Sequence, residues 1–159
     1  MIKKTLTLFT IICLSFNLFG QCKYEINEID KFTNQSKIET KSEIIYKDFN
    51  TALSINLCKY DTTYFIKIGI NLTDQVYSVL KGDKILLKLE NSQIVEIISL
   101  ETKIISGFSY VKYSINSDDF VKLKSSLITD IRIYLNKEYI DRTIDNKKGS
   151  KIKIISNCI

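Results

Sequence analysis

Apolar and polar side chains alternate along several short segments, and this period of two constrains the fold more than any other sequence feature. Residues 64–70, 84–90 and 130–135 show the pattern most clearly, with isoleucine, leucine or tyrosine at every second position. Alternation puts one set of side chains on each face of an extended strand, so each segment indicates a strand with one buried and one solvated face. Branched and aromatic residues, which strands favour, supply most of the apolar positions.

Short polar segments interrupt the alternation at intervals of about 8–12 residues, a spacing typical of antiparallel sandwiches and barrels. Turns are expected at residues 33–36, 59–62, 81–83, 90–93 and 136–137. The strands between them are expected near residues 24–32, 38–46, 52–57, 63–70, 84–89, 94–100, 131–135 and 138–144. We therefore predict a mainly β, antiparallel, sandwich-like single domain of about eight strands over residues 21–159.

Two segments depart from the strand pattern. Asn116 or Ser117 would cap a helix over residues 118–125, because two aspartates follow in what would be its positive first turn. The C-terminal residues 146–159 are ambiguous, because Ile152, Ile155 and Ile159 fit a helix whereas Ile152 and Ile154 fit a strand. A helix that begins after Gly149-Ser150 is slightly favoured.

The first 20 residues have the pattern of a secretory signal peptide: a basic start, an apolar run of about 14 residues and a small residue, Gly20. The run is shorter than the roughly 20 residues that a membrane-spanning helix needs, so a permanent anchor is less favoured. Cys22 follows Gln21 rather than a small residue, which disfavours lipid attachment. We predict a signal peptide over residues 1–20, a mature chain without a transmembrane segment, and a periplasmic or extracellular location.

The cysteines fit an oxidising compartment. Removal of the signal peptide would leave Cys22, Cys58 and Cys158, an odd number that leaves at least one thiol unpaired within a monomer. We expect a disulfide between Cys22 and Cys158, since these two residues lie at the ends of the mature chain. Cys58 is expected to be buried or at the edge of a turn. The alternative, a reactive thiol, lacks a histidine to act as its base.

Composition excludes several chemistries. The chain contains no histidine, so it cannot form a Ser-His-Asp triad, a Cys-His pair or a histidine metal site. Its formal net charge is only +5, and Arg132 and Arg142 are its two arginines. Because arginine is favoured in phosphate and base recognition, nucleic-acid binding is poorly supported. Nothing in the sequence indicates a cofactor or a metal ion.

Two groups of acidic residues are the remaining candidates for chemistry. Glu28 and Asp30 would share a strand face with Cβ atoms roughly 7 Å apart, which is loosely compatible with a catalytic carboxylate pair for glycoside hydrolysis. Acidic residues also protect edge strands from aggregation, which is the favoured interpretation. Asp118 and Asp119, considered with Asp130, match no calcium loop, so helix capping is favoured for the first two.

Three short motifs carry a resemblance to other proteins. Residues 24–33, 131–134 and 157–159 are similar to segments of small uncharacterised exported proteins of Gram-negative bacteria. The resemblance implies export and a β-rich single domain, and it brings no activity or site residues with it.

These features together lead us to expect a non-catalytic exported module that binds a protein or another component of the cell envelope. One alternative is an inhibitor or immunity-type module, which would present a contiguous exposed apolar or aromatic patch. A second alternative is a hydrolase that uses carboxylates alone, which would have an acid-lined cleft and a raised carboxyl pKa.

Overall fold

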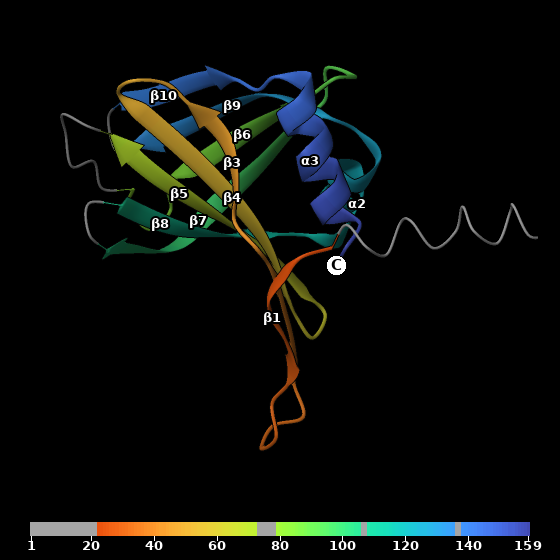
Figure 1. Cartoon of the computed structure of the whole chain (residues 1–159). Helices are drawn as coiled ribbons and strands as arrows, with labels where there is room; N and C mark the ends of the chain where they lie inside the picture. The colour runs from red at the N-terminus through yellow and green to blue at the C-terminus, as the bar shows by residue number, and fades with distance from the viewer. Residues whose placement is uncertain (1–21, 73–78, 106–107, 136–137) are drawn as a thin grey trace, which may run out of the picture.

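The computed structural model describes residues 22–72, 79–105, 108–135 and 138–159, so the expected signal peptide and the turn at 136–137 lie outside it. The strands are β1 (Tyr24–Ile29), β2 (Ser36–Thr40), β3 (Glu43–Lys47), β4 (Thr51–Tyr60), β5 (Thr63–Leu72), β6 (Lys84–Leu89), β7 (Ile94–Ile105), β8 (Phe108–Ile115), β9 (Ile128–Leu135) and β10 (Glu138–Thr143). The helices are α2 (Ser117–Ser125) and α3 (Asn146–Ser156). The predicted mainly β class is confirmed (Figure 1). Within the described ranges, no helix has the length and apolar character needed to span a membrane.

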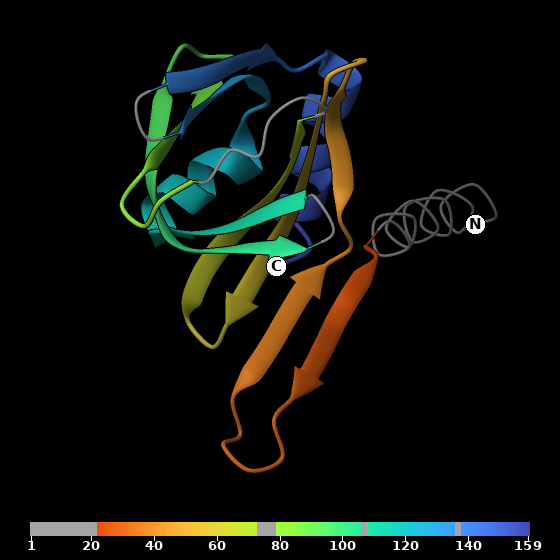
Figure 2. The ribbon, with the colours of Figure 1, turned by 90° about the vertical axis from the view of Figure 1, so that its left-hand side faces the viewer.

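The ten strands form one antiparallel sheet in the order β1-β2-β4-β5-β8-β7-β6-β9-β10, with β3 also paired to β4. The sheet curls around the two helices, as Figure 2 shows. A side chain of the end strand β10 contacts the other half of the sheet, because Arg142 Nη2 donates to Thr51 Oγ1 of β4 at 2.8 Å. The same guanidinium lies over the ring of Tyr46 in β3.

Alternate residues on the inner face of the sheet form the core. Leu53, Ile55 and Leu57 of β4 are fully buried, while the residues between them face outwards. The same cluster includes Ile66 and Ile68 of β5, Ile85 and Leu87 of β6, and Ile131 and Ile133 of β9. Strands far apart in the sheet therefore bury one common apolar core, as the alternation predicts.

The structure has two strands beyond the eight predicted, β3 and β8. The expected strand over residues 38–46 divides at Lys41, whose backbone N–H donates to Lys23 O and turns the chain from β2 into β3. Both halves pair with the same edge of β4. In addition, β8 was not among the predicted strands, although its side chains alternate, and it pairs with β5 and β7 in the middle of the sheet.

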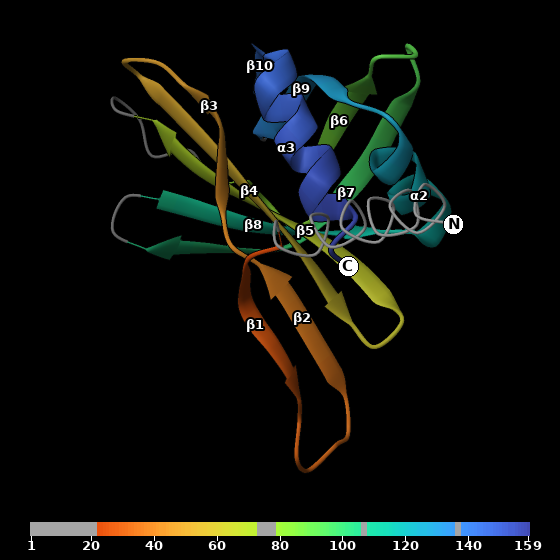
Figure 3. The same cartoon turned by 45° about the vertical axis from the view of Figure 1, so that its right-hand side comes forward.

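The hairpin of β1 and β2 projects beyond the rest of the sheet (Figures 2 and 3). Residues 37–39 of β2 pair with β4 on one side and with residues 26–28 of β1 on the other, and Asp61 in the β4–β5 turn hydrogen-bonds to Ser36. The turn over residues 30–35 extends past this point. A disulfide between Cys22 and Cys158, the pairing that the sequence predicts, fastens the base of the hairpin to the chain just after α3. Tyr24 Oη also donates to Cys158 O at 3.0 Å.

Helix α2 agrees closely with its predicted bounds. The Asn116 side chain accepts a hydrogen bond from the Asp119 backbone N–H, so Asn116 is the cap. Phe120 and Leu123 are buried, as their shared helical face predicts. The ring of Phe120 stacks on Tyr64 with 4.3 Å between ring centroids, which packs the helix against β5.

The C-terminal segment is a helix, as favoured from the sequence, but its predicted start after Gly149-Ser150 was wrong. Asp145 caps α3 by accepting from the Lys148 backbone N–H at 2.9 Å, so the helix begins at Asn146. Gly149 lies inside the helix because its backbone packs against β9. A Cβ atom there would lie 2.8 Å from the carbonyl oxygen of Ile128.

The contact at Gly149 predicts the effect of a substitution. In an exposed helix, Gly→Ala stabilises by about 1 kcal/mol. In Gly149→Ala, the clash with the Ile128 backbone should outweigh this gain and lower the free energy of unfolding, since overpacking usually costs about 1–3 kcal/mol. Urea denaturation measures the change. Lys147→Ala, at an exposed position of the same helix, is the control, and an increase in stability for Gly149→Ala would contradict the packing described.

The disulfide predicts a second change in stability. Cys22 and Cys158 are 136 residues apart, and closing so long a loop stabilises the folded state by about 5 kcal/mol in the chain-entropy treatment. The double variant Cys22→Ser/Cys158→Ser should lose a large part of this amount in urea denaturation, with its core intact by circular dichroism. Equal stability of the variant and the parent chain would rule out this role.

Candidate functional site

The tip of the projecting hairpin is held by the side chain of Asp30. Its Oδ1 atom accepts hydrogen bonds from the backbone N–H groups of Phe32 and Thr33, each at 2.9 Å. Two backbone bonds complete the turn, from Asp30 N to Gln35 O and from Asn34 N to Asp30 O. Asn34 has a φ angle of 57°, a conformation that asparagine tolerates better than most residues. The tip therefore has a defined backbone.

This ordered tip displays apolar side chains to solvent. Phe32 is 98% exposed and Ile29, at the end of β1, is 67% exposed. Phe49 is also 94% exposed, but it lies in the turn between β3 and β4, away from the hairpin tip. Asp48 holds that second turn by accepting from the Thr51 backbone N–H. Among the described residues, Phe32 and Phe49 are thus exposed on ordered turns, and Phe32 is the one on the projecting β1–β2 hairpin.

The two acidic residues proposed from the sequence have different surroundings. Asp30 anchors the turn, and the hydrogen bonds from the backbone of Thr33 and Phe32 lower the pKa of its carboxyl to about 2. A general acid needs a raised pKa, so the shift at Asp30 has the wrong direction for that role. Glu28 is exposed on β1, opposite Lys37 of β2. Asp30 is therefore best explained as a structural residue.

The lowered pKa of Asp30 predicts how the tip responds to acid. Because the folded pKa of about 2 lies below the ordinary 3.8, the ionised carboxylate stabilises the turn above pH 3.8, and this contribution disappears as the pH falls through 2. The amide NMR signals of Phe32 and Thr33 should therefore shift with a midpoint near 2. Asp30→Asn keeps the acceptor oxygen and should abolish the titration without loss of the turn. A midpoint near 4 in the parent chain would contradict the assigned hydrogen bonds.

A buried polar cluster supports the base of the hairpin. Glu39 of β2 is only 6% exposed, and its carboxylate accepts from Asn56 Nδ2 at 2.6 Å and pairs with Lys67 Nζ. Tyr60 Oη donates to the same carboxylate at 3.4 Å. Sequence analysis did not single out Glu39, because only its register opposite Cys58 of β4 reveals that these side chains meet.

Cys58 lies beside this cluster and is buried, as expected. Burial, together with the nearby carboxylate of Glu39, raises the pKa of its thiol to about 12. The nucleophilic form of cysteine is the thiolate, so the alternative interpretation as a reactive thiol finds no support in these surroundings.

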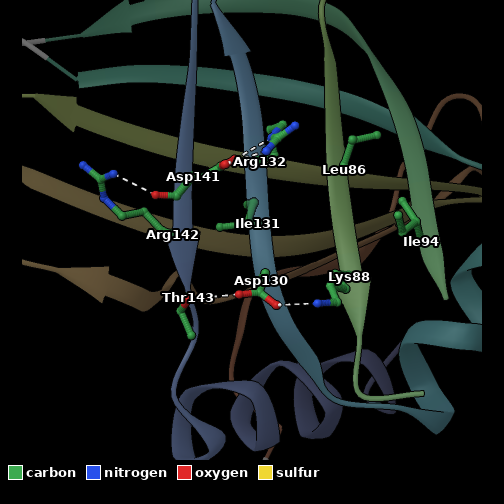
Figure 4. Close-up of a pocket in the computed structure, with 9 residues that line it drawn as sticks. All are labelled: Leu86, Lys88, Ile94, Asp130, Ile131, Arg132, Asp141, Arg142 and Thr143. Atoms are coloured by element: carbon green, nitrogen blue, oxygen red, sulfur yellow. Dashed lines mark hydrogen bonds and ion pairs between the residues drawn. The ribbon is translucent and has the colours of Figure 1, made fainter. Parts of the chain in front are cut away.

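A second surface feature lies on the outer face of β6, β9 and β10, where an open depression has a volume of about 460 Å³ (Figure 4). Its apolar lining consists of Leu86 of β6, Ile131 of β9 and Ile94 at the start of β7. Arg132 forms one wall with Asp141, donating from Nε and Nη2 to the two carboxylate oxygens at 2.6 Å each. This pair raises the pKa of Arg132 and lowers that of Asp141.

The opposite wall of the depression contains Lys88, Asp130 and Thr143. Thr143 Oγ1 donates to Asp130 Oδ1 at 2.9 Å, and Lys88 Nζ lies 3.7 Å from Asp130 Oδ2. Asp130 therefore belongs to this surface, whereas Asp118 and Asp119 occupy the first turn of α2. Among the described residues, no group of three or more acidic residues or cysteines could hold a metal ion.

Comparison with known proteins adds no relative to this picture. No family model, curated protein or solved structure matches the chain. The geometry of the hairpin and of the depression is therefore the basis on which its function is inferred.

Proposed function

We propose that the protein is an exported, non-catalytic interaction module that binds a protein partner of the cell envelope or the secreted space through its β1–β2 hairpin. The observation that carries this proposal is the exposure of Phe32, at 98%, on a tip whose backbone Asp30 holds in place. Export is supported by the signal-like residues 1–20 and by the disulfide, a bond that persists in oxidising compartments.

The energetics of Phe32 favour a binding role. Burial of a phenylalanine side chain is favourable by about 1.5–3 kcal/mol of free energy relative to leaving it in water. Phe32 is exposed in the free protein, so this free energy is available for binding a partner. Aromatic side chains are enriched at protein interfaces for the same reason. An apolar pocket on a partner would receive Phe32, and Ile29 is also exposed on the same hairpin.

The rigidity of the hairpin adds to this argument. Its tip is held by Asp30, its middle by pairing with β4, and its base by the Cys22–Cys158 disulfide. A segment that is already ordered loses less conformational entropy when it binds, so more of the contact energy appears as affinity.

An inhibitor or immunity-type module is the more specific candidate within this class. The projection of the hairpin beyond the sheet favours it, since a narrow two-stranded element can enter a cleft that the body of the domain cannot (Figure 3).

Site-specific photocrosslinking tests the proposal. A benzoylphenylalanine at position 32 should give a discrete crosslinked product with one protein in envelope or culture-medium fractions of the producing cell. Position 49 is the matched control, because Phe49 is equally exposed on another ordered turn. The same products from both positions, or none from position 32, would refute the proposal.

The captured partner then allows a quantitative test. Phe32→Ala should weaken its binding by at least about tenfold, as expected for an aromatic anchor, while Phe49→Ala should leave it unchanged. Because Phe32 is exposed, its replacement should change the free energy of unfolding by less than about 0.5 kcal/mol. Loss of affinity can thereby be separated from loss of folding by thermal denaturation of both variants.

A further inference from the structure

We propose that the depression on the outer face of β6, β9 and β10 is a binding site for a neutral sugar unit. The site is separate from the hairpin and does not depend on the function proposed for it. Its volume of about 460 Å³ falls within the range of small-molecule sites.

The charges that line the depression favour a neutral ligand. Arg132 and Lys88 supply two positive charges, and Asp141 and Asp130 supply two negative ones. The net charge of these two pairs is therefore zero. Arg142 also belongs to the lining, but its guanidinium is engaged outside the two walls. It donates to Thr51 Oγ1 and to the Asp141 backbone oxygen, and it lies over the Tyr46 ring. Each wall carries one positive and one negative side chain, so an anion or a cation would be repelled by the like charge on both walls. An uncharged ligand would not be repelled.

The hydrogen-bonding groups favour a ligand with several hydroxyls. An ionised carboxylate has about four acceptor positions, and Asp141 uses only two of them for Arg132. Lys88 Nζ, at 3.7 Å from Asp130, is beyond hydrogen-bond distance and can turn towards a ligand. A sugar hydroxyl both donates and accepts, so one ring can satisfy donors and acceptors on both walls at once.

The geometry of the walls also suits a ring. The bidentate Arg132–Asp141 pair keeps its donors and acceptors in one fixed arrangement, which lowers the entropy lost when a ligand binds. Leu86 and Ile94 offer an apolar surface against which the C–H face of a sugar can pack. An open depression of this kind is expected to bind weakly and to gain strength from repeated units of a polymer.

Two-dimensional ¹H–¹⁵N NMR titration of the full domain tests the inference. The probes are three neutral trisaccharides, cellotriose, maltotriose and the trimer of N-acetylglucosamine, together with the charged sugars glucuronic acid and glucosamine. At least one neutral probe should shift the amide signals of Lys88, Ile131 and Thr143 in a saturable way. Shifts from the charged sugars should be smaller.

Two variants keep the test independent of folding. Arg132→Lys retains the charge but not the planar fork, and Thr143→Val removes one hydroxyl. Each should weaken binding by about tenfold, with signals elsewhere unchanged. Glu43→Gln, which removes an ion pair with Lys151, and Thr63→Val, on an exposed strand end, are the matched controls.

Three results would overturn the inference. One is the absence of saturable shifts with all three neutral probes. Another is stronger binding of glucuronic acid or glucosamine than of the neutral trisaccharides. The last is equal binding by the parent chain, Arg132→Lys and Thr143→Val, which would place the sugar elsewhere on the molecule.

Discussion

The inner face of one long sheet has to bury its apolar side chains, and the arrangement of the whole domain follows from that requirement. The sheet curls so that Leu57 and Ile66 share a core with Leu87 and Ile131 from strands near its other end. Helix α3 covers part of the same core, with Ile152 and Ile155 buried. This placement also brings the end of the chain to the base of the hairpin, where the disulfide with Cys22 forms.

The two proposed binding surfaces use this framework in different ways. The hairpin extends beyond the core, and its order comes from local devices: the turn at Asp30, the pairing with β4, and the disulfide at its base. The depression lies on the solvated face of the sheet, and the opposite face of β6 and β9 carries core residues such as Ile85, Leu87 and Ile133. Its polar side chains are therefore carried on a rigid support, and the pairing of Arg132 with Asp141 keeps them in one arrangement. A projecting apolar tip suits a protein partner, whereas a charge-balanced polar depression suits a small neutral ligand.

Much of the local structure could be predicted because it depends on neighbours in the sequence. Alternation located most strands, and the cap at Asn116 located α2. The prediction failed where a distant contact decided the outcome. From the sequence, Gly149 is typical of a helix boundary. In the structure it lies inside the helix, because the backbone of Ile128 in β9 leaves no room for a side chain there. The turn at Lys41 likewise depends on Lys23, the residue just before β1.

The sequence by itself determined the strand period, the capped helix, the cysteines suited to a terminal disulfide, and the absence of histidine chemistry. Only the tertiary structure decided which charged groups meet, as for Glu39 with Lys67 and Arg132 with Asp141. It also decided that Asp30 holds a turn instead of forming a carboxylate pair with Glu28. The physical reason is that strand register and the curl of the sheet bring together residues whose separation in the sequence carries no information about contact.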